Sequence, residues 1–272
     1  MMKIAEWLAK STTILRTAGI DSARLDSLIL LENVLSYSRV AILTRQDDVI
    51  PDKALRLLDS YLSRRQKRKP IAYIIGKKDF YGREFNVTNA VLIPRPESET
   101  IIDKVLALHL SKDARIVDVG TGSGVLAITL ALELPNVQVH AIDVDKSALE
   151  IAKKNNHLLQ ANVHFSQGDL LENVRLKFDV IVANLPYVSD TQYVSPETVY
   201  EPMLALYADD DGLYLIKKLL TQIQTQRLLE NSGYLLLESE PRQHDAIQRY
   251  AKNCDFRLVN THGFIQQFQL VD

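Results

Sequence analysis

The sequence contains very little cysteine, with Cys254 as the single residue in a chain of 272. One cysteine cannot form a disulfide within the chain, so nothing indicates an oxidising compartment. The six histidines are scattered, and none pairs with the cysteine at metal-ligand spacing, which predicts that there is no metal site. Hydrophobic residues make up 46% and charged residues 24%, the balance of a globular protein that buries a full core.

Long uninterrupted apolar runs are absent as well. The N-terminal segment interleaves polar with apolar residues and lacks the continuous apolar centre of a signal peptide. The apolar stretch VLAITLALELP, at residues 125–135, is too short and too interrupted to span a bilayer. We therefore expect a cytoplasmic protein without a membrane partner.

The chain also has no excess of positive charge. Its formal net charge is -2 and its isoelectric point is about 6.3. Proteins that hold DNA or RNA through phosphates usually carry a basic excess, because neutralised phosphates release counterions and this release drives binding. The charge balance argues against stable nucleic-acid binding. No apolar surface repeat indicates an oligomer, so we expect a monomer.

The first third of the chain has helical patterning. Apolar residues recur at helical spacing in one segment that ends at Gly19, in a second that begins near Asp21 or Ser22, and in a third that Pro51 opens. The basic run at residues 64–69 then breaks the pattern. We interpret this run as a solvated linker, with attraction to an acidic protein surface or to RNA as the alternative. The segment predicts a small helical bundle over residues 1–70.

From about Ala72 the pattern changes to that of strands. Aromatic and β-branched residues around Gly76 and Gly82 predict a β-hairpin, which would form a linker over residues 71–93. Beyond Pro94, apolar runs alternate with helical segments, so we expect an α/β domain over residues 94–272 with a mostly parallel, doubly wound, Rossmann-like sheet. The expected strands cover residues 115–119, 137–143, 163–169, 178–184 and 233–239. A last hairpin, over 256–260 and 264–271, is expected to close the sheet edge.

A glycine-rich segment, Asp-Val-Gly-Thr-Gly-Ser-Gly at residues 118–124, leads from the first of these strands into an apolar helix. Glycines let the backbone turn tightly and approach a ligand, and free N–H groups at a helix start hold a negative group. A Walker loop is excluded because no Gly-Lys-Ser/Thr follows, and the spacing differs from the nicotinamide fingerprint. Asp118 is unfavourable beside a pyrophosphate, but it suits the ammonium and sulfonium groups of S-adenosylmethionine.

Two further carboxylates end the next two expected strands. Asp143 is placed to accept hydrogen bonds from both ribose hydroxyls, and Asp169 to accept one from an adenine amino group. Each alone is as well explained as a helix cap or turn residue, but together with the glycine loop they favour a cofactor site. We expect S-adenosylmethionine as cofactor and S-adenosylhomocysteine as product. The expected cofactor-binding residues are Asp118, Gly120, Thr121, Gly122, Gly124, Asp143, Asp169 and Asn184.

The fourth expected strand ends in Asn184-Leu185-Pro186-Tyr187. Ligands of doubly wound sheets bind outside the carboxyl ends of the strands where strand order reverses, so this tetrapeptide should face the glycine loop. The Asn184 side-chain oxygen and the Leu185 carbonyl can each accept one N–H of a planar NH2 group, as in a glutamine amide, an adenine or a cytosine. The alternative is a proline-containing turn with an incidental asparagine. No Asp, His or Lys lies beside Asn184, so we assign no base and expect catalysis by positioning and electrostatics.

These residues resemble the protein-(glutamine-N5) methyltransferases of the HemK/PrmC type, which modify peptide chain release factors. The most specific similarity is Ile-Pro-Arg-Pro-Glu-Ser-Glu at residues 93–99. Further matching stretches are 23–26, 70–76, 80–82, 118–124, 184–187, 200–202, 205–206 and 211–213. The sequence departs from the family in two ways. Leu185 stands where a proline is usual, and the C-terminal hairpin around His262 is less basic than is usual.

The resemblance implies a helical N-terminal domain that docks the protein substrate, a hairpin linker and a Rossmann-like methyltransferase domain. It implies that Asn184 and Tyr187 are catalytic and, with Leu185 and Pro186, bind the glutamine of the Gly-Gly-Gln motif of release factors. Residues 94–99 should then lie over the active site.

Three other functions are compatible with parts of this pattern. An N5-glutamine methyltransferase of a ribosomal protein would use the same chemistry. An adenine-N6 methyltransferase of DNA or RNA has a similar tetrapeptide, but the low isoelectric point, the helical segment and residues 94–99 argue against it. A non-catalytic module that binds the cofactor or a release factor is disfavoured by the complete set of expected residues.

Overall fold

The computed structural model describes residues 1–189 and 195–271, which form two compact units. Unit 1 consists of Met1–Gly76 with Ser195–Tyr200, and unit 2 of Lys77–Val194 with Glu201–Asp272. Among the described residues, no helix has the length and apolar character needed to cross a membrane. The predicted roles of residues 1–70 in docking and of 71–93 as a linker remain predictions.

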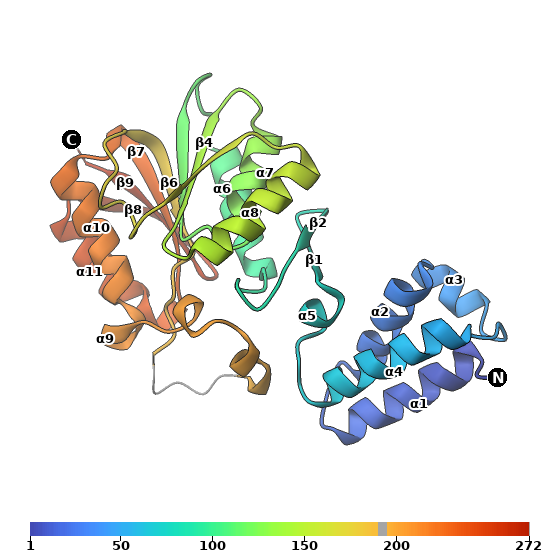
Figure 1. The fold of residues 1–272 in the computed structure, drawn as a ribbon. Helices are drawn as coiled ribbons and strands as arrows, with labels where there is room; N and C mark the ends of the chain where they lie inside the picture. The colour runs from blue at the N-terminus through green and yellow to red at the C-terminus, as the bar shows by residue number, and fades with distance from the viewer. Residues whose placement is uncertain (190–194, 272) are drawn as a thin grey trace. The chain divides into compact units, whose positions relative to one another are not determined.

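Unit 1 is a helical bundle in which α1, α2 and α4 pack against one another (Figure 1). The three predicted helices are confirmed, and Ser22 is the N-cap of α2. Trp7 and Leu15 of α1 are fully buried at the centre of the bundle, because apolar residues at helical spacing point to one face. The helices of this unit are α1 (Ile4–Thr17), α2 (Ala23–Leu35), α3 (Arg39–Thr44), α4 (Asp52–Gln66) and α5 (Ile71–Ile75), with a 3-10 turn η2 (Pro196–Tyr200).

The beginning of the predicted hairpin is wrong by several residues. Tyr73 and Ile75, which lie inside the segment 71–93 predicted as a hairpin, belong to α5, and Gly76 with φ +79° is the C-cap of this helix. Pro70 precedes the helix, where its fixed φ favours helix initiation and its missing N–H costs nothing. The strand pattern therefore begins only at Lys77.

The basic run at residues 64–69 is not a solvated linker throughout. α4 continues to Gln66, and Arg65 is only 6% exposed. The Arg65 Nε donates to Asp26 Oδ2 at 2.6 Å, and its Nη1 donates to Glu197 Oε1 at 3.2 Å. Arg68 pairs with the same Glu197 oxygen at 3.2 Å. Two of the basic side chains thus hold unit 1 together.

Unit 2 contains the hairpin β1 (Lys77–Phe80) and β2 (Arg83–Asn86) and a seven-stranded sheet of order β5-β4-β3-β6-β7-β9-β8. β3 to β7 are parallel, while β9 runs antiparallel to β7 and β8 antiparallel to β9. The order confirms the predicted Rossmann-like sheet with a hairpin at its edge. The strands are β3 (Arg115–Val119), β4 (Gln138–Asp143), β5 (Val163–Gln167), β6 (Phe178–Ala183), β7 (Leu229–Glu238), β8 (Phe256–His262) and β9 (Ile265–Leu270).

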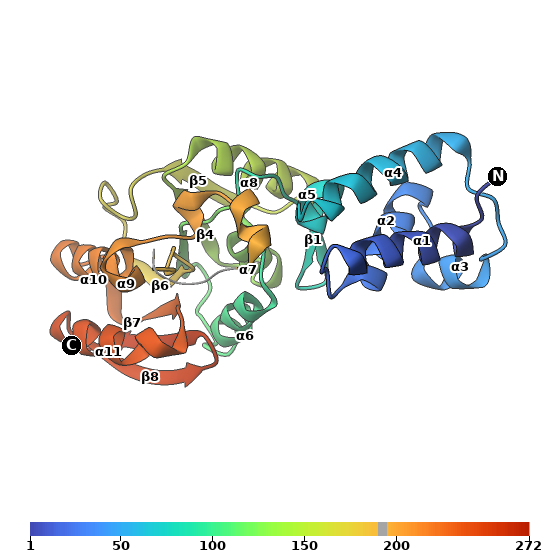
Figure 2. The ribbon, with the colours of Figure 1, turned by 90° about the horizontal axis from the view of Figure 1, so that it is seen from below.

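Helices cover both faces of this sheet (Figures 1 and 2). Residues alternate along each strand, so Ile116 packs in one buried cluster and Val117 and Val119 in the other. α6 (Glu99–Leu106), α7 (Val125–Glu133) and α8 (Lys146–Leu159) lie on one face, and α10 (Tyr214–Gln226) and α11 (His244–Asn253) on the other. The short elements of unit 2 are α9 (Asp209–Gly212), η1 (Pro96–Ser98), η3 (Met203–Ala205) and η4 (Pro241–Gln243).

Strand order reverses between β3 and β6, which is the arrangement in which the glycine loop and the Asn-Leu-Pro-Tyr segment face each other. From β3 the chain proceeds outward to β4 and β5, returns to β6 on the other side of β3, and continues to β7. Several strand ends differ from the prediction: β5 stops at Gln167, β7 begins at Leu229, and β8 extends to His262. Asp169 therefore lies just beyond its strand rather than in it.

Candidate active site

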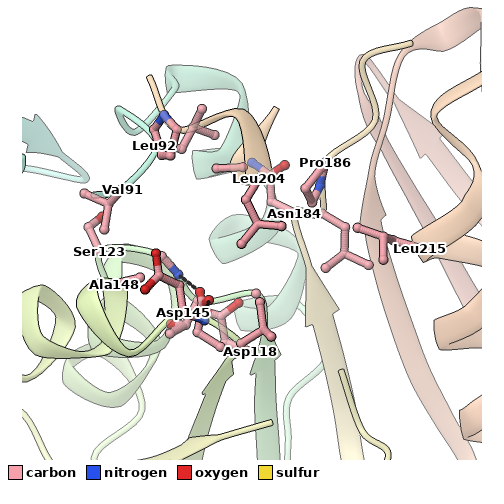
Figure 3. Close-up of a pocket in the computed structure, with 18 of the residues that line it drawn as sticks. Val91, Leu92, Asp118, Ser123, Asp145, Ala148, Asn184, Pro186, Leu204 and Leu215 are labelled. Carbon is pink, nitrogen blue, oxygen red and sulfur yellow. Dashed lines mark hydrogen bonds between the residues drawn. The ribbon is translucent and has the colours of Figure 1, made fainter. Parts of the chain in front are cut away.

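A cavity of about 360 Å³ lies at the carboxyl ends of β3, β4 and β6. This volume falls in the range of about 300–1,000 Å³ that is typical of small-molecule sites. Figure 3 shows Asp118 near the end of β3, Asn184 and Pro186 after β6, Leu204 beside them and Leu92 above. The glycine loop and the Asn-Leu-Pro-Tyr segment thus border one cavity at the reversal of strand order.

The glycine loop needs glycine for two separate reasons. Gly120 has φ +75°, and a Cβ there would lie 2.9 Å from Leu185 Cδ2, so the backbone passes too close to the opposite wall for a side chain. Gly124 has φ +84° and a Cβ there would meet Ile128 and Ala152. At Gly122 a Cβ would meet nothing within 4 Å, because this residue borders the open cavity. The loop is therefore packed from behind and open towards a ligand.

Asp118 is a buried carboxylate, 1% exposed, that borders the cavity. Its Oδ2 accepts hydrogen bonds from Thr121 Oγ1 at 2.6 Å and from the Ala127 N–H at 3.3 Å. Its Oδ1 is buried and has no partner among the described residues. Burial and, to a smaller extent, the charge of Asp143 raise the pKa of Asp118 to about 7, despite these two hydrogen bonds. A buried carboxylate whose second oxygen has no partner is complementary to a positively charged ligand. Asp118 therefore suits the ammonium and sulfonium groups of S-adenosylmethionine.

Asp143 connects the glycine loop to β4. Its Oδ2 accepts from the Gly122 N–H at 2.8 Å and its Oδ1 from the Asp145 N–H at 2.9 Å. Burial raises its pKa, and these backbone hydrogen bonds oppose the rise. Each carboxylate oxygen keeps a second acceptor site, so the predicted contacts to two ribose hydroxyls stay compatible with this geometry.

Asp169 borders the same cavity, but it has a partner that the sequence did not predict. Its Oδ2 lies 2.6 Å from the Lys218 Nζ of α10. Lys218 also lines the cavity. The structure brings Asp169 to the predicted place, and its contact to an adenine amino group remains a prediction.

Asn184, Leu185 and Pro186 line the cavity, whereas Tyr187 does not. Tyr187 packs against the buried cluster on the α10 side of the sheet, and its hydroxyl lies 3.4 Å from Glu238 Oε1. Burial, followed by the charges of Glu238 and Glu240, raises the pKa of Tyr187. The predicted catalytic roles of Asn184 and Tyr187 remain predictions. Because Tyr187 does not line the cavity, it could contact only a part of a substrate that lies outside it.

The segment at residues 94–99 lies against the cavity, as the family resemblance implied. Pro94, Arg95 and Ser98 are among the lining residues. The buried Glu201 fixes the segment, because its Oε1 accepts from Arg95 Nη2 at 2.6 Å and its Oε2 from the Ile93 N–H at 3.2 Å. The sequence had assigned no role to Glu201.

Sequence reasoning also missed the carboxylate at the end of β7. Glu238 is 1% exposed, and its Oε2 accepts from Ser98 Oγ at 2.6 Å. Ser98 Oγ in turn accepts from Asn184 Nδ2 at 3.0 Å. Burial raises the pKa of Glu238 to about 7. The sequence shows a charged residue at the end of an otherwise apolar predicted strand, but nothing local indicates its contact with Ser98.

Comparison with known proteins identifies the two units separately. Residues 6–76 match the PrmC N-terminal domain, and residues 98–205 match the methyltransferase small domain. Among solved structures, a methyltransferase from Pyrococcus furiosus is 21% identical, covers 76% of this chain and 96% of its own, and has a TM-score of 0.53, which shows the fold. A 16S rRNA methyltransferase of T. thermophilus, solved in complex with AdoMet and guanosine, is 15% identical over 72% of this chain and 50% of its own, with a TM-score of 0.50.

Closer similarity is found among curated protein sequences. A release factor glutamine methyltransferase of Neisseria gonorrhoeae is 39% identical over 87% of this chain and 84% of its own length. The proteins of the same name from Bacillus subtilis and Haemophilus influenzae are 37% and 32% identical, over 91% and 96% of this chain and 88% and 94% of their own. With this similarity over both units, the chain belongs to the release factor glutamine methyltransferase family and is an S-adenosylmethionine-dependent methyltransferase.

Proposed function

We propose that this protein transfers the methyl group of S-adenosylmethionine to the side-chain amide nitrogen, N5, of the glutamine in the Gly-Gly-Gln motif of peptide chain release factors. One observation carries the proposal: Asn184 and the buried carboxylate Asp118, whose Oδ1 has no partner among the described residues, line the same cavity. Asn184 suits a planar NH2 acceptor and Asp118 suits a cationic methyl donor. The family to which the chain belongs carries out this reaction on release factors.

The cofactor would be held by the carboxyl ends of β3 and β4. Asp118 would face its positive charge, the open backbone at Gly122 would allow close approach, and Asp143 would accept hydrogen bonds from its ribose. Bound there, S-adenosylmethionine supplies an electrophilic methyl group on a sulfonium. Gly120 and Thr121 also line the cavity and would contact the cofactor, whereas Gly124, which does not line it, would act by shaping the loop.

Asn184 and Leu185 would orient the acceptor. An amide nitrogen is a poor nucleophile, because its lone pair is delocalised into the carbonyl. The Asn184 Oδ1 and the Leu185 carbonyl would accept its two N–H groups, which aligns the nitrogen with the methyl group and stabilises the positive charge that develops on it. As the N–C bond forms and the C–S bond breaks, one amide proton is lost to solvent. Pro186 limits the freedom of the turn that presents both acceptors.

The experiment uses the intact chain and methyl-labelled S-adenosylmethionine. It is incubated separately with a release factor, with ribosomal protein and with nucleic acid, and the products are digested and analysed by mass spectrometry. The proposal expects N5-methylglutamine in the release factor and none after its Gly-Gly-Gln glutamine is replaced by alanine. Label in a ribosomal-protein glutamine or in N6-methyladenine would instead assign the enzyme to another substrate, and cofactor binding without any transfer would exclude a catalytic role.

A further inference from the structure

Three side chains from distant parts of unit 2 form a continuous polar chain at the wall of the cavity. Asn184 at the end of β6 donates through Nδ2 to Ser98 Oγ at 3.0 Å. Ser98, in η1, donates through Oγ to Glu238 Oε2 at 2.6 Å. Ser98 and Glu238 are each no more than 3% exposed, so water does not compete for these contacts. This series of hydrogen bonds ends at the cavity, which Asn184 and Ser98 both line.

The chemistry of the three groups fixes the direction of these hydrogen bonds. An ionised carboxylate only accepts, so the single hydroxyl proton of Ser98 must point to Glu238. Ser98 can then offer only a lone pair to Asn184, and a lone pair selects the NH2 side of the asparagine amide. The opposite side of that planar amide carries Oδ1. An ionised Glu238 therefore decides, through Ser98, which face of Asn184 is available to a substrate.

We propose that Ser98 and Glu238 are positioning residues that hold Asn184 with its carbonyl oxygen available to the substrate amide. The proposal rests on the function proposed above, in which that oxygen accepts an N–H of the glutamine. Rotation of the Asn184 amide by half a turn would present its own NH2 to the substrate NH2. Two donors would then face each other, and the acceptor would be lost. The two orientations differ little in shape, so packing alone does not select between them.

Protonation of Glu238 removes this control. A protonated carboxyl can donate to Ser98, whose own proton is then free to bond to Asn184 Oδ1, and the whole chain of hydrogen bonds reverses. Glu238 gains its proton near neutral pH, because burial and the nearby charge of Glu97 in η1 raise its pKa to about 7. The hydrogen bonds that Ser98 and Tyr187 donate to Glu238 oppose the rise. Farther charges at this end of the sheet, Arg95 and Glu240, act on the neighbouring Tyr187.

Two variants and a matched control test the positioning role in the full chain. Ser98→Ala removes the connection, Glu238→Gln removes the ionisable acceptor, and Ser98→Thr keeps the hydroxyl. At saturating S-adenosylmethionine, we expect kcat of the wild type and of Ser98→Thr to rise with pH through about 7, the pKa of Glu238. Above this pH, kcat of Ser98→Ala and of Glu238→Gln should be about tenfold lower than that of the wild type, which corresponds to the loss of one hydrogen bond. In both variants kcat should no longer rise with pH. The dissociation constant of the cofactor should not change.

A double-mutant cycle separates this role from ordinary packing. If Ser98 and Glu238 act only through Asn184, the double variant Ser98→Ala/Glu238→Gln loses no more activity than the worse single variant. Losses that multiply, a wild-type pH profile in Ser98→Ala, or an equal loss in Ser98→Thr would each overturn the proposal.

A measurement without turnover keeps this test independent of the proposed function. The side-chain amide resonance of Asn184, assigned by its loss in Asn184→Ala, should shift with pH around 7 in the wild type and stay unchanged in Ser98→Ala. If the wild type methylates no release factor but this shift is present, the proposed substrate is wrong while the orientation of Asn184 stands. If the enzyme is active and the shift is absent, the positioning role is wrong.

Discussion

Asn184 and Ser98 are joined by a hydrogen bond of 3.0 Å, although 86 residues separate them in the chain. The bond joins the Ile-Pro-Arg-Pro-Glu-Ser-Glu segment to the Asn-Leu-Pro-Tyr turn, the two stretches that the sequence marks most strongly. It gives the first of these stretches a physical role in the site. The buried Glu201 supports the same segment from the other side through Arg95 and the Ile93 N–H.

Asp118 should control cofactor affinity through its charge. Because burial raises its pKa to about 7, the carboxyl is neutral in part of the free enzyme below that pH and ionised above it. A cationic ligand binds the ionised form, so affinity should weaken as pH falls below about 7, by up to about tenfold per pH unit. Calorimetric titration with S-adenosylmethionine at several pH values measures this dependence.

The matched variant is Asp118→Asn, which keeps the shape of the side chain. Its affinity should be at least about tenfold lower than that of the wild type at pH 8, and it should not vary with pH in the same range. Equal pH dependence in the variant would show that another group titrates.

Gly120 should tolerate no side chain. In Gly120→Ala the new Cβ would lie 2.9 Å from Leu185 Cδ2, so the Leu185 side chain must move, and at φ +75° the loop backbone is strained. We expect weaker cofactor binding and lower transfer activity in addition to lost stability. Gly263→Ala is the control, because it has φ +55° and nothing within 4 Å of the Cβ. It should lose about 1 kcal/mol of unfolding free energy from backbone strain without any change in cofactor affinity. Thermal unfolding with and without cofactor compares the two.

Unit 1 should depend on the buried contact between Arg65 and Asp26. Replacing Arg65 by alanine leaves Asp26, whose side chain is 5% exposed, without its cation. The cost for such a buried pair is about 3–5 kcal/mol of unfolding free energy. Lys3→Ala, which breaks the exposed pair with Asp47, should cause a much smaller loss, because solvent screens that pair. Denaturant titration of the full chain measures both, and equal small losses would show that Arg65 is not structurally important.

The sheet could be predicted from the sequence because its signals are local. Strand β3 has the predicted limits, and the alternation of strands and helices predicted the parallel sheet, whose observed order reverses between β3 and β6. α5 was missed because five apolar and aromatic residues, Ile71 to Ile75, fit a strand pattern as well as a short helix. Only the adjacent Pro70 and Gly76 distinguish the two.

The cofactor side of the site was predictable and the support of the substrate side was not. Asp118, Asp143 and Asp169 each follow a strand pattern, so topology alone places them at one edge. Ser98 and Glu238 act on Asn184 through contacts that span 86 and 140 residues, for which the chain has no local signal. The same holds for Lys218, whose pairing with Asp169 depends on how α10 packs.

The central claim is that Asn184 presents the acceptor nitrogen to the methyl donor, and a single-turnover measurement tests it most directly. Enzyme saturated with labelled S-adenosylmethionine is mixed with a release factor, and the rate of N5-methylglutamine formation is compared between the wild type and Asn184→Ala. Loss of an acceptor that acts on the developing charge should slow transfer by about 100-fold or more. Transfer by Asn184→Ala at the wild-type rate would contradict the account.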